Sequence, residues 1–139
     1  FETERIKLKA CAKACWETVD TADSTVSIEV DCSVTADRNR FRQLLANLFR
    51  NAVEHGGQDV TVTVGRITDG FYVEDDGPGI PADKQDEVFE SGHSATEGGT
   101  GFGLSIVARV ADAHGWEVQV TDGTAGGARF EIIGVESIE

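Results

Sequence analysis

The chain has 139 residues, a length that fits a single domain able to fold without disulfide bonds. Its formal net charge of −13, from 12 Lys and Arg against 25 Asp and Glu, argues against a nucleic-acid partner, whose phosphates it would repel. No apolar run is long enough to span a membrane and no signal peptide is visible, so we expect a cytoplasmic domain. Because the first residue is Phe1, we expect a fragment of a longer protein that is either soluble or membrane-anchored.

The first part of the chain predicts two strands and two helices. Short alternating apolar runs at residues 6–8 and 25–30 are typical of strands, and the alanine-rich segment 9–19 is typical of a helix. Asp37 occupies the position of an N-cap before the strongest helical pattern, residues 38–55.

The rest of the chain predicts four more strands and a third helix. Alternation indicates strands at residues 60–64, 71–73, 116–120 and 128–133. The apolar pattern at 102–113 indicates a helix, which Gly115 ends. The fold class is therefore α+β: one domain over the whole chain, with a mixed, largely antiparallel sheet covered on one face by three helices as an α/β sandwich.

The three cysteines, Cys11, Cys15 and Cys32, are odd in number and lack C-x-x-C spacing. They predict neither a disulfide framework nor a zinc site. We expect small, buried thiols in a reducing compartment.

A polar row borders the apolar stripe of the 38–55 helix. At 100° per residue, Asn47, Asn51 and His55 fall within about 80° of one another. Because burying an unpaired amide costs roughly 1 to 3 kcal/mol, the asparagines either hydrogen-bond to nearby backbone or hold a ligand.

The strand at 71–73 runs directly into carboxylates and then into two glycines and two prolines that end it. Asp75 or Asp76 therefore either caps a turn or accepts a hydrogen bond from a ligand amine at the sheet edge. The sequence leaves both alternatives open.

Glycines at alternate positions precede the third helix. Gly99, Gly101 and Gly103 can turn tightly and direct several N–H groups toward an anion, although such a stretch is also compatible with a simple turn. Its spacing matches neither a dinucleotide fingerprint nor a P-loop. The preceding polar segment, residues 82–99, predicts a long loop of the kind that forms either lids or disordered links.

Taken together, four blocks resemble the N, G1, F and G2 boxes of sensor histidine kinases, in the family's order. The blocks are Asn47 to His55, Asp75 to Ile80, Phe89, and Gly99 to Leu104. The resemblance implies the catalytic ATP-binding domain of the GHKL superfamily, shared with gyrase, a heat-shock chaperone and mismatch-repair ATPases. The acidic, lysine-poor sequence further resembles haloarchaeal sensor kinases, the alternative being an ordinary acidic domain.

The resemblance also implies roles for single residues. Asn51 resembles the Mg²⁺ ligand, and an amide oxygen suits that ion. Asp75 resembles the carboxylate that accepts the adenine amino hydrogen, and the glycines let the nucleotide approach the backbone. The implied set for ATP and Mg²⁺ is Asn47, Asn51, His55, Asp75, Gly77, Gly79, Ile80, Phe89, Gly99, Thr100, Gly101, Phe102, Gly103 and Leu104.

Three positions depart from common family patterns, namely Glu54, Thr96 and Ala128. They keep two alternatives open: a degenerate nucleotide-binding interaction module and an anti-sigma-type serine kinase domain.

The resemblance implies a parent kinase whose γ-phosphoryl acceptor is a histidine on a separate helical dimerisation domain. None of His55, His93 and His114 lies in an acceptor motif. We therefore expect this chain to position the nucleotide without autophosphorylating alone. Its expected partners are that helical domain and a response regulator, with the isolated domain a monomer and the parent a homodimer.

Overall fold

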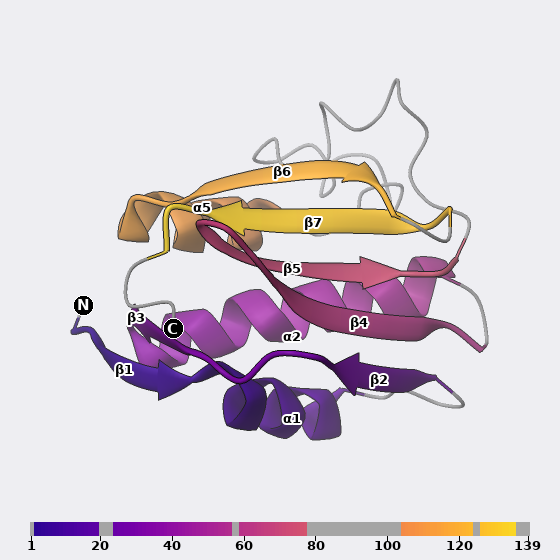
Figure 1. Ribbon diagram of the computed structural model, residues 1–139, viewed down its shortest axis with the longest axis horizontal. Helices are drawn as coiled ribbons and strands as arrows, with labels where there is room; N and C mark the ends of the chain where they lie inside the picture. Colours follow the sequence, from indigo (N-terminus) through magenta and orange to yellow (C-terminus); the bar gives the residue numbers. More distant parts are fainter. Residues whose placement is uncertain (1, 20–23, 57–58, 78–103, 124–125, 136–139) are drawn as a thin grey trace.

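The structure is a computed structural model that describes residues 2–19, 24–56, 59–77, 104–123 and 126–135. Three helices and seven strands lie in these ranges (Figure 1). In chain order they are β1 (Glu4–Lys7), α1 (Leu8–Thr18), β2 (Thr25–Ile28), β3 (Ser33–Ala36), α2 (Arg38–Gly56), β4 (Thr61–Ile67), β5 (Gly70–Asp75), α5 (Ser105–His114), β6 (Glu117–Asp122) and β7 (Ala128–Ile133).

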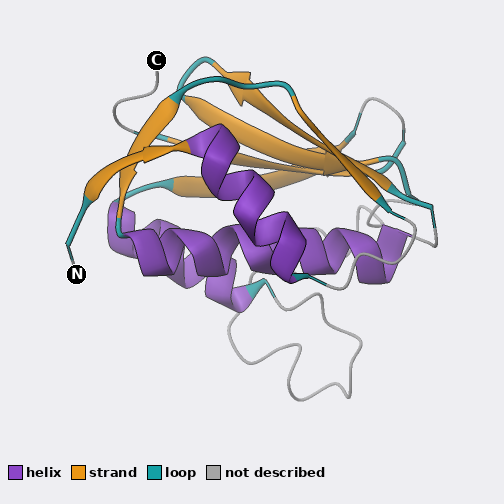
Figure 2. Cartoon of the chain, turned by 90° about the horizontal axis from the view of Figure 1, so that it is seen from below, coloured by secondary structure: helices purple, strands orange, loops and turns teal. Residues whose placement is uncertain are grey.

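Five of the strands form one sheet in the order β2-β4-β5-β7-β6. β2 runs parallel to β4, and the other neighbouring pairs are antiparallel. β1 and β3 form a separate antiparallel pair. The three described helices cover one face of the sheet (Figure 2). The predicted α+β sandwich with a mixed, largely antiparallel sheet is confirmed.

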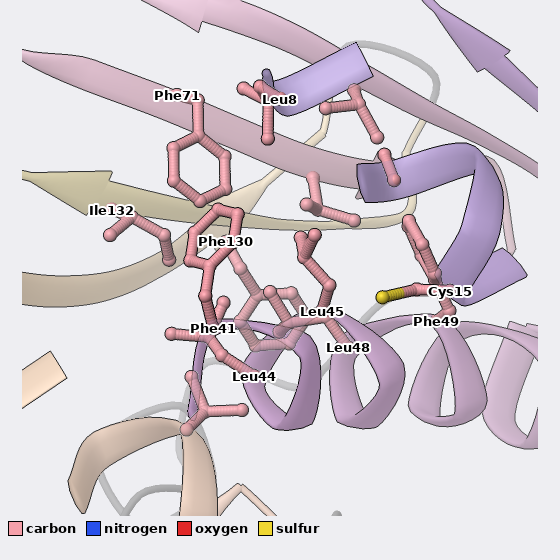
Figure 3. Packing of buried hydrophobic residues seen from close by; sticks show 14 of the residues in the cluster. Leu8, Cys15, Phe41, Leu44, Leu45, Leu48, Phe49, Phe71, Phe130 and Ile132 are labelled. Carbon is pink, nitrogen blue, oxygen red and sulfur yellow. The ribbon is translucent and has the colours of Figure 1, made fainter. Parts of the chain in front are cut away.

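α2 supplies the centre of the hydrophobic core (Figure 3). Its predicted apolar stripe is fully buried at Phe41, Leu44, Leu45 and Leu48. Phe49 lies outside that stripe and is nevertheless fully buried, because α1 packs against α2 and the Trp16 ring meets the Phe49 ring edge-on at 5.3 Å.

The ends of two helices are tied together. Asp37 is the N-cap of α2, as the sequence predicts, and its Oδ1 accepts the Arg40 N–H at 3.0 Å. The Asp37 N–H in turn donates to Nε2 of His114, the last residue of α5, at 3.0 Å. Gly115 then ends α5 with φ +77°, a left-handed conformation that favours glycine.

The structure differs from the sequence prediction at several element boundaries and in one strand. Leu8 begins α1 rather than ending a strand, because Leu8, Cys11, Ala12 and Cys15 share one buried helical face. The strand Ser33–Ala36 is not predicted, although its four residues alternate between polar and apolar; its partner is the distant β1, and such non-local pairing leaves no local signal. The described part of α5 begins at Ser105 instead of Phe102; Phe102 itself lies outside the described residues.

Candidate functional site

Two segments that the sequence singles out reach the same end of the molecule. The carboxyl-terminal part of α2, with Asn47 and Asn51, and the carboxyl end of β5, with Asp75, both lie to the right in Figure 1. α2 also packs against β5. The fold therefore places the amides and the carboxylate on neighbouring elements at one end of the domain.

Asp75 is the last residue of β5, and it is buried with 6% of its surface exposed. Its Oδ1 accepts the backbone N–H of Gly77 at 2.9 Å and that of Ala128 at 3.3 Å. Two backbone donors from different segments fix the orientation of the carboxylate. The side chain is thus buried, held in place and able to carry negative charge at the carboxyl end of the central strand of the sheet.

The neighbouring Asp76 differs from Asp75 both in its burial and in its hydrogen bonding. It is exposed, and its Oδ1 accepts the N–H of Thr61 at 2.8 Å, which joins the end of β5 to the start of β4. Of the two carboxylates that the sequence leaves open, Asp76 ties two strands together and Asp75 is the buried candidate for a ligand.

Burial raises the pKa of Asp75 above its ordinary value of 3.8. The hydrogen bonds from the Gly77 and Ala128 N–H groups act in the opposite direction, and the charges of Asp76 and Glu74 add to the rise. The ionised carboxylate is therefore held at a cost, which a hydrogen-bond donor on a ligand would offset.

The turn between β6 and β7 packs directly on Asp75. A Cβ added to Gly127 would collide with the backbone carbonyl and Oδ1 of Asp75, and one added to Gly123 would lie 3.4 Å from that carbonyl. The prediction from sequence did not include Gly127, or the N–H of Ala128, in the site. Their proximity depends on the pairing of β5 with β7, which no local pattern reveals.

Asn51 lies on the buried side of α2, with 5% of its surface exposed. Among the described residues, its Oδ1 is buried without a hydrogen-bond partner. Asn47, one turn earlier, uses its Nδ2 to donate to the Gln43 carbonyl of the same helix at 2.8 Å. Hydrogen bonding to nearby backbone thus accounts for the amide nitrogen of Asn47, whereas the buried oxygen of Asn51 fits a cation ligand.

The other predicted site residues are described incompletely or not at all. His55 belongs to α2, but its side chain is not described; Gly77 contacts Asp75 as above; Leu104 precedes α5 and is fully buried. The remainder lie outside the described residues: Gly79, Ile80, Phe89, Gly99, Thr100, Gly101, Phe102 and Gly103.

Comparison with known proteins identifies the family and the fold. The family described as "Histidine kinase-, DNA gyrase B-, and HSP90-like ATPase" matches residues 36–135. The chain belongs to this family. Its fold is similar to that of solved histidine kinases. The catalytic domain of ThkA superposes with a TM-score of 0.76 and 25% identity, covering 95% of this chain and 94% of that one. Full-length ShkA in complex with AMPPNP superposes with a TM-score of 0.76 and 26% identity, covering 97% of this chain and 31% of that one.

Relatives in sequence are sensor kinases. The chain is 39% identical over 103 residues to the signal transduction histidine-protein kinase AfsQ2 of Streptomyces coelicolor, and 29% identical over 113 residues to the virulence sensor histidine kinase PhoQ of Salmonella typhimurium. The alignments cover 69% and 78% of this chain but only 19% and 23% of those proteins. These relatives favour an ATP-binding domain of the histidine-kinase branch over the degenerate-module and anti-sigma alternatives.

Within the described ranges, no helix is both long and apolar enough to cross a membrane.

Proposed function

We propose that this chain binds ATP with Mg²⁺ and presents the γ-phosphoryl group to a histidine on a separate helical domain of the same sensor kinase. The observation that carries the proposal is the buried Asp75 carboxylate, oriented by two backbone N–H groups at the end of β5. Membership of an ATPase family and the kinase relatives support it.

Asp75 suits recognition of adenine. Both hydrogen bonds described for the carboxylate use Oδ1, so Oδ2 is the oxygen assigned to the exocyclic amine of adenine. Guanine carries a carbonyl oxygen at the corresponding ring position, and two acceptors repel each other. The domain should therefore prefer ATP to GTP.

Asn51 suits the metal. Mg²⁺ prefers a few protein oxygens alongside waters and nucleotide phosphates, and the Asn51 Oδ1 is a buried oxygen without a partner among the described residues. The described residues contain no cluster of three or more His, Cys, Asp or Glu that could hold an ion without the nucleotide. When bound, Mg²⁺ supplies charge neutralisation of the phosphates, the main requirement of phosphoryl transfer.

The acceptor histidine belongs to the rest of the parent kinase in this proposal. His114 is unsuited to the role because both ring nitrogens are engaged, Nδ1 with the Val110 carbonyl at 2.7 Å and Nε2 with the Asp37 N–H at 3.0 Å. We therefore assign to the parent a helical dimerisation domain with the acceptor, homodimeric assembly and a response regulator as the next acceptor. Three free, buried cysteines are consistent with a cytoplasmic location.

Calorimetric titration of the chain with ATP and GTP, in low-salt and in multimolar KCl buffers, tests the proposal. We expect ATP to bind and GTP to bind much more weakly. Asp75→Asn should lose about 10- to 100-fold in ATP affinity, the equivalent of one hydrogen bond to a charged group. Asp76→Asn is the matched control, because it changes the same charge on the adjacent residue, and should bind ATP like the native chain. Equal affinities of the native chain and Asp75→Asn for ATP would overturn the adenine assignment.

A further inference from the structure

A second chemical feature lies away from the nucleotide site, between β1, α1 and α2. A pocket of about 280 Å³ there is lined by Arg5 and Lys7 of β1, Arg38 and Arg42 of α2, and Cys11 of α1 with its alanine neighbours. Four of the chain's 12 Lys and Arg thus line one small pocket of a protein with net charge −13. Arg38 also pairs with Glu4 of β1 at 2.9 Å.

One of two neighbouring thiols on α1, that of Cys11, lines this pocket. Cys11 and Cys15 are free and stand one turn apart on α1, with 5% and 4% of their surfaces exposed. The Cys15 thiol donates to the Arg42 carbonyl of α2, with 3.8 Å between Sγ and the oxygen, and it also acts on the neighbouring Cys11 thiol. Figure 3 shows Cys15 beside the Phe49 side chain, on the core side of α1. The two sulfurs therefore have different surroundings: Cys11 lines the basic pocket, whereas Cys15 lies between the core and the Arg42 carbonyl.

The surroundings separate the acidities of the two thiols. The hydrogen bond from Cys15, together with the charges of Arg42 and Arg38, lowers the pKa of Cys11 to about 7 against the effect of burial. The same hydrogen bond and burial raise the pKa of Cys15. Cys11 is consequently the thiol of the pair that ionises near neutral pH, while Cys15 keeps its proton, which is shared between the Arg42 carbonyl and the Cys11 sulfur.

We propose that Cys11 is a site of oxidative modification, at which a hydroperoxide converts the thiolate to a sulfenic acid inside the basic pocket. The Cys11 sulfur attacks one peroxide oxygen, so that the S–O bond forms as the O–O bond breaks. Sulfur gives up two electrons to the peroxide, and the departing hydroxide takes a proton from the buffered solvent and leaves as water. Hydrogen peroxide is small and uncharged, which suits a thiol that is nearly buried.

The helix keeps this product from closing a disulfide with Cys15. Residues four apart on a helix have Cβ atoms about 5–6 Å apart, whereas a disulfide needs about 3.5–4.5 Å. Closing the bond would require α1 to distort at Leu8–Thr18, where Leu8 and Ala12 are fully buried. The sulfenic acid should therefore persist long enough to be trapped.

The chain supplies its own control in Cys32. Its exposed fraction, 6%, is close to the 5% of Cys11, but burial raises the pKa of its thiol. If reactivity follows access, both cysteines will react alike. If it follows thiolate character, Cys11 will react first.

The test treats the full chain with hydrogen peroxide in the presence of dimedone and locates adducts by peptide mass spectrometry. We expect the adduct on Cys11, with Cys15 and Cys32 largely unlabelled. Labelling of Cys32 at the same rate, absence of label on Cys11, or rapid formation of a Cys11–Cys15 disulfide would each overturn the proposal.

Variants identify the groups responsible. Cys15→Ala should slow labelling of Cys11 about three-fold near neutral pH, because the lost thiolate fraction is partly offset by higher intrinsic nucleophilicity. Cys15→Ser keeps a donor and should preserve the rate. Arg42→Gln should slow labelling, while Arg66→Gln, the same charge change beside Cys32, should not. Circular dichroism of each variant checks folding, and an unchanged Cys11 rate in folded Cys15→Ala and Arg42→Gln would contradict the assigned roles.

Discussion

Asp75 and Ala128 are 53 residues apart in the chain, yet the Ala128 N–H donates to Oδ1 of the Asp75 carboxylate at 3.3 Å. The contact joins the last residue of β5 to the first residue of β7, which are neighbours in the sheet. It means that the orientation of the candidate adenine-binding carboxylate depends on the β6–β7 turn. Substitutions in that turn should therefore affect nucleotide binding without touching the ligand.

Gly127→Ala tests this dependence. The added Cβ would collide with the Asp75 backbone carbonyl and Oδ1, so the carboxylate must move and ATP affinity should fall at least about ten-fold. Gly126→Ala is the matched control. Gly126 has φ +92°, and its Cβ would meet nothing within 4 Å. That variant should lose stability, by about 1–2 kcal/mol, from backbone strain alone. Calorimetry and thermal unfolding of both variants separate the effects, and equal losses of ATP affinity would contradict the link to Asp75.

Asp75→Asn should make the nucleotide-free domain more stable than the native chain, by a margin that grows as pH rises. The folded-state pKa of Asp75 is raised by burial, so ionisation favours the unfolded chain, and stability is lost between the unfolded pKa of about 3.9 and the higher folded value. Asparagine does not ionise and can still accept the Gly77 and Ala128 N–H groups. The difference in unfolding free energy between Asp75→Asn and the native chain should be near zero below about pH 4 and should grow in favour of Asn above it. A difference that favours aspartate at neutral pH would contradict the direction of the pKa shift.

Local patterns were enough to predict most elements of this fold. The α2 stripe, the Asp37 cap and the Gly115 end are each set by neighbours in sequence, and the structure confirms them. The alternation of β5 also distinguishes Asp75 from Asp76 as the buried carboxylate. Phe71, Val73 and Asp75 alternate on one face of β5, so Asp75 shares the buried side.

Other features could not be predicted because they depend on non-local pairing. β2 pairs with β4 in parallel across α2, and β3 pairs with β1, from which α1 and β2 separate it. The placement of Gly127 and Ala128 on Asp75 likewise follows from sheet order. The glycine block at 99–103 and the segment before it lie outside the described residues, so their assignment to the phosphates and to a lid stays a prediction.

Arg129→Lys should destabilise the domain although it preserves charge. The guanidinium bonds to Glu74 at 3.0 Å and to Glu131 at 2.8 Å, and it lies 3.9 Å from the centre of the Tyr72 ring. Lysine cannot reproduce the two-sided hydrogen bonding or the stacking. Because the arginine side chain is 19% exposed and its ion pairs are partly screened by solvent, we expect the free energy of unfolding to fall by about 1 kcal/mol.

Urea unfolding measures this loss, with Arg66→Lys, an exposed arginine on β4, as the control. The Gln119 amide and Arg129 lower the pKa of Glu131 below its ordinary value of 4.5. A lowered pKa stabilises the fold above the unfolded value, and this contribution is lost as pH falls through the folded value. The difference in free energy of unfolding between the native chain and Arg129→Lys should therefore become smaller at acidic pH. A difference that becomes larger at acidic pH would exclude Glu131 as a partner of Arg129.

Asn51→Ala should remove the dependence of nucleotide binding on Mg²⁺. In the nucleotide-free domain the Asn51 Oδ1 is buried without a partner among the described residues, so its deletion should change the free energy of unfolding by less than about 1 kcal/mol. With ATP the same oxygen is assigned to the metal. Titration with ATP in Mg²⁺ and in EDTA should then give nearly equal affinities for Asn51→Ala, while the native chain binds more tightly with Mg²⁺. Asn47→Ala, on the same helix one turn earlier, should retain a Mg²⁺ effect, because the described bond of Asn47 is donated to its own helix at Gln43. If Asn51→Ala loses equal affinity with and without Mg²⁺, the oxygen serves the nucleotide or the fold and not the metal.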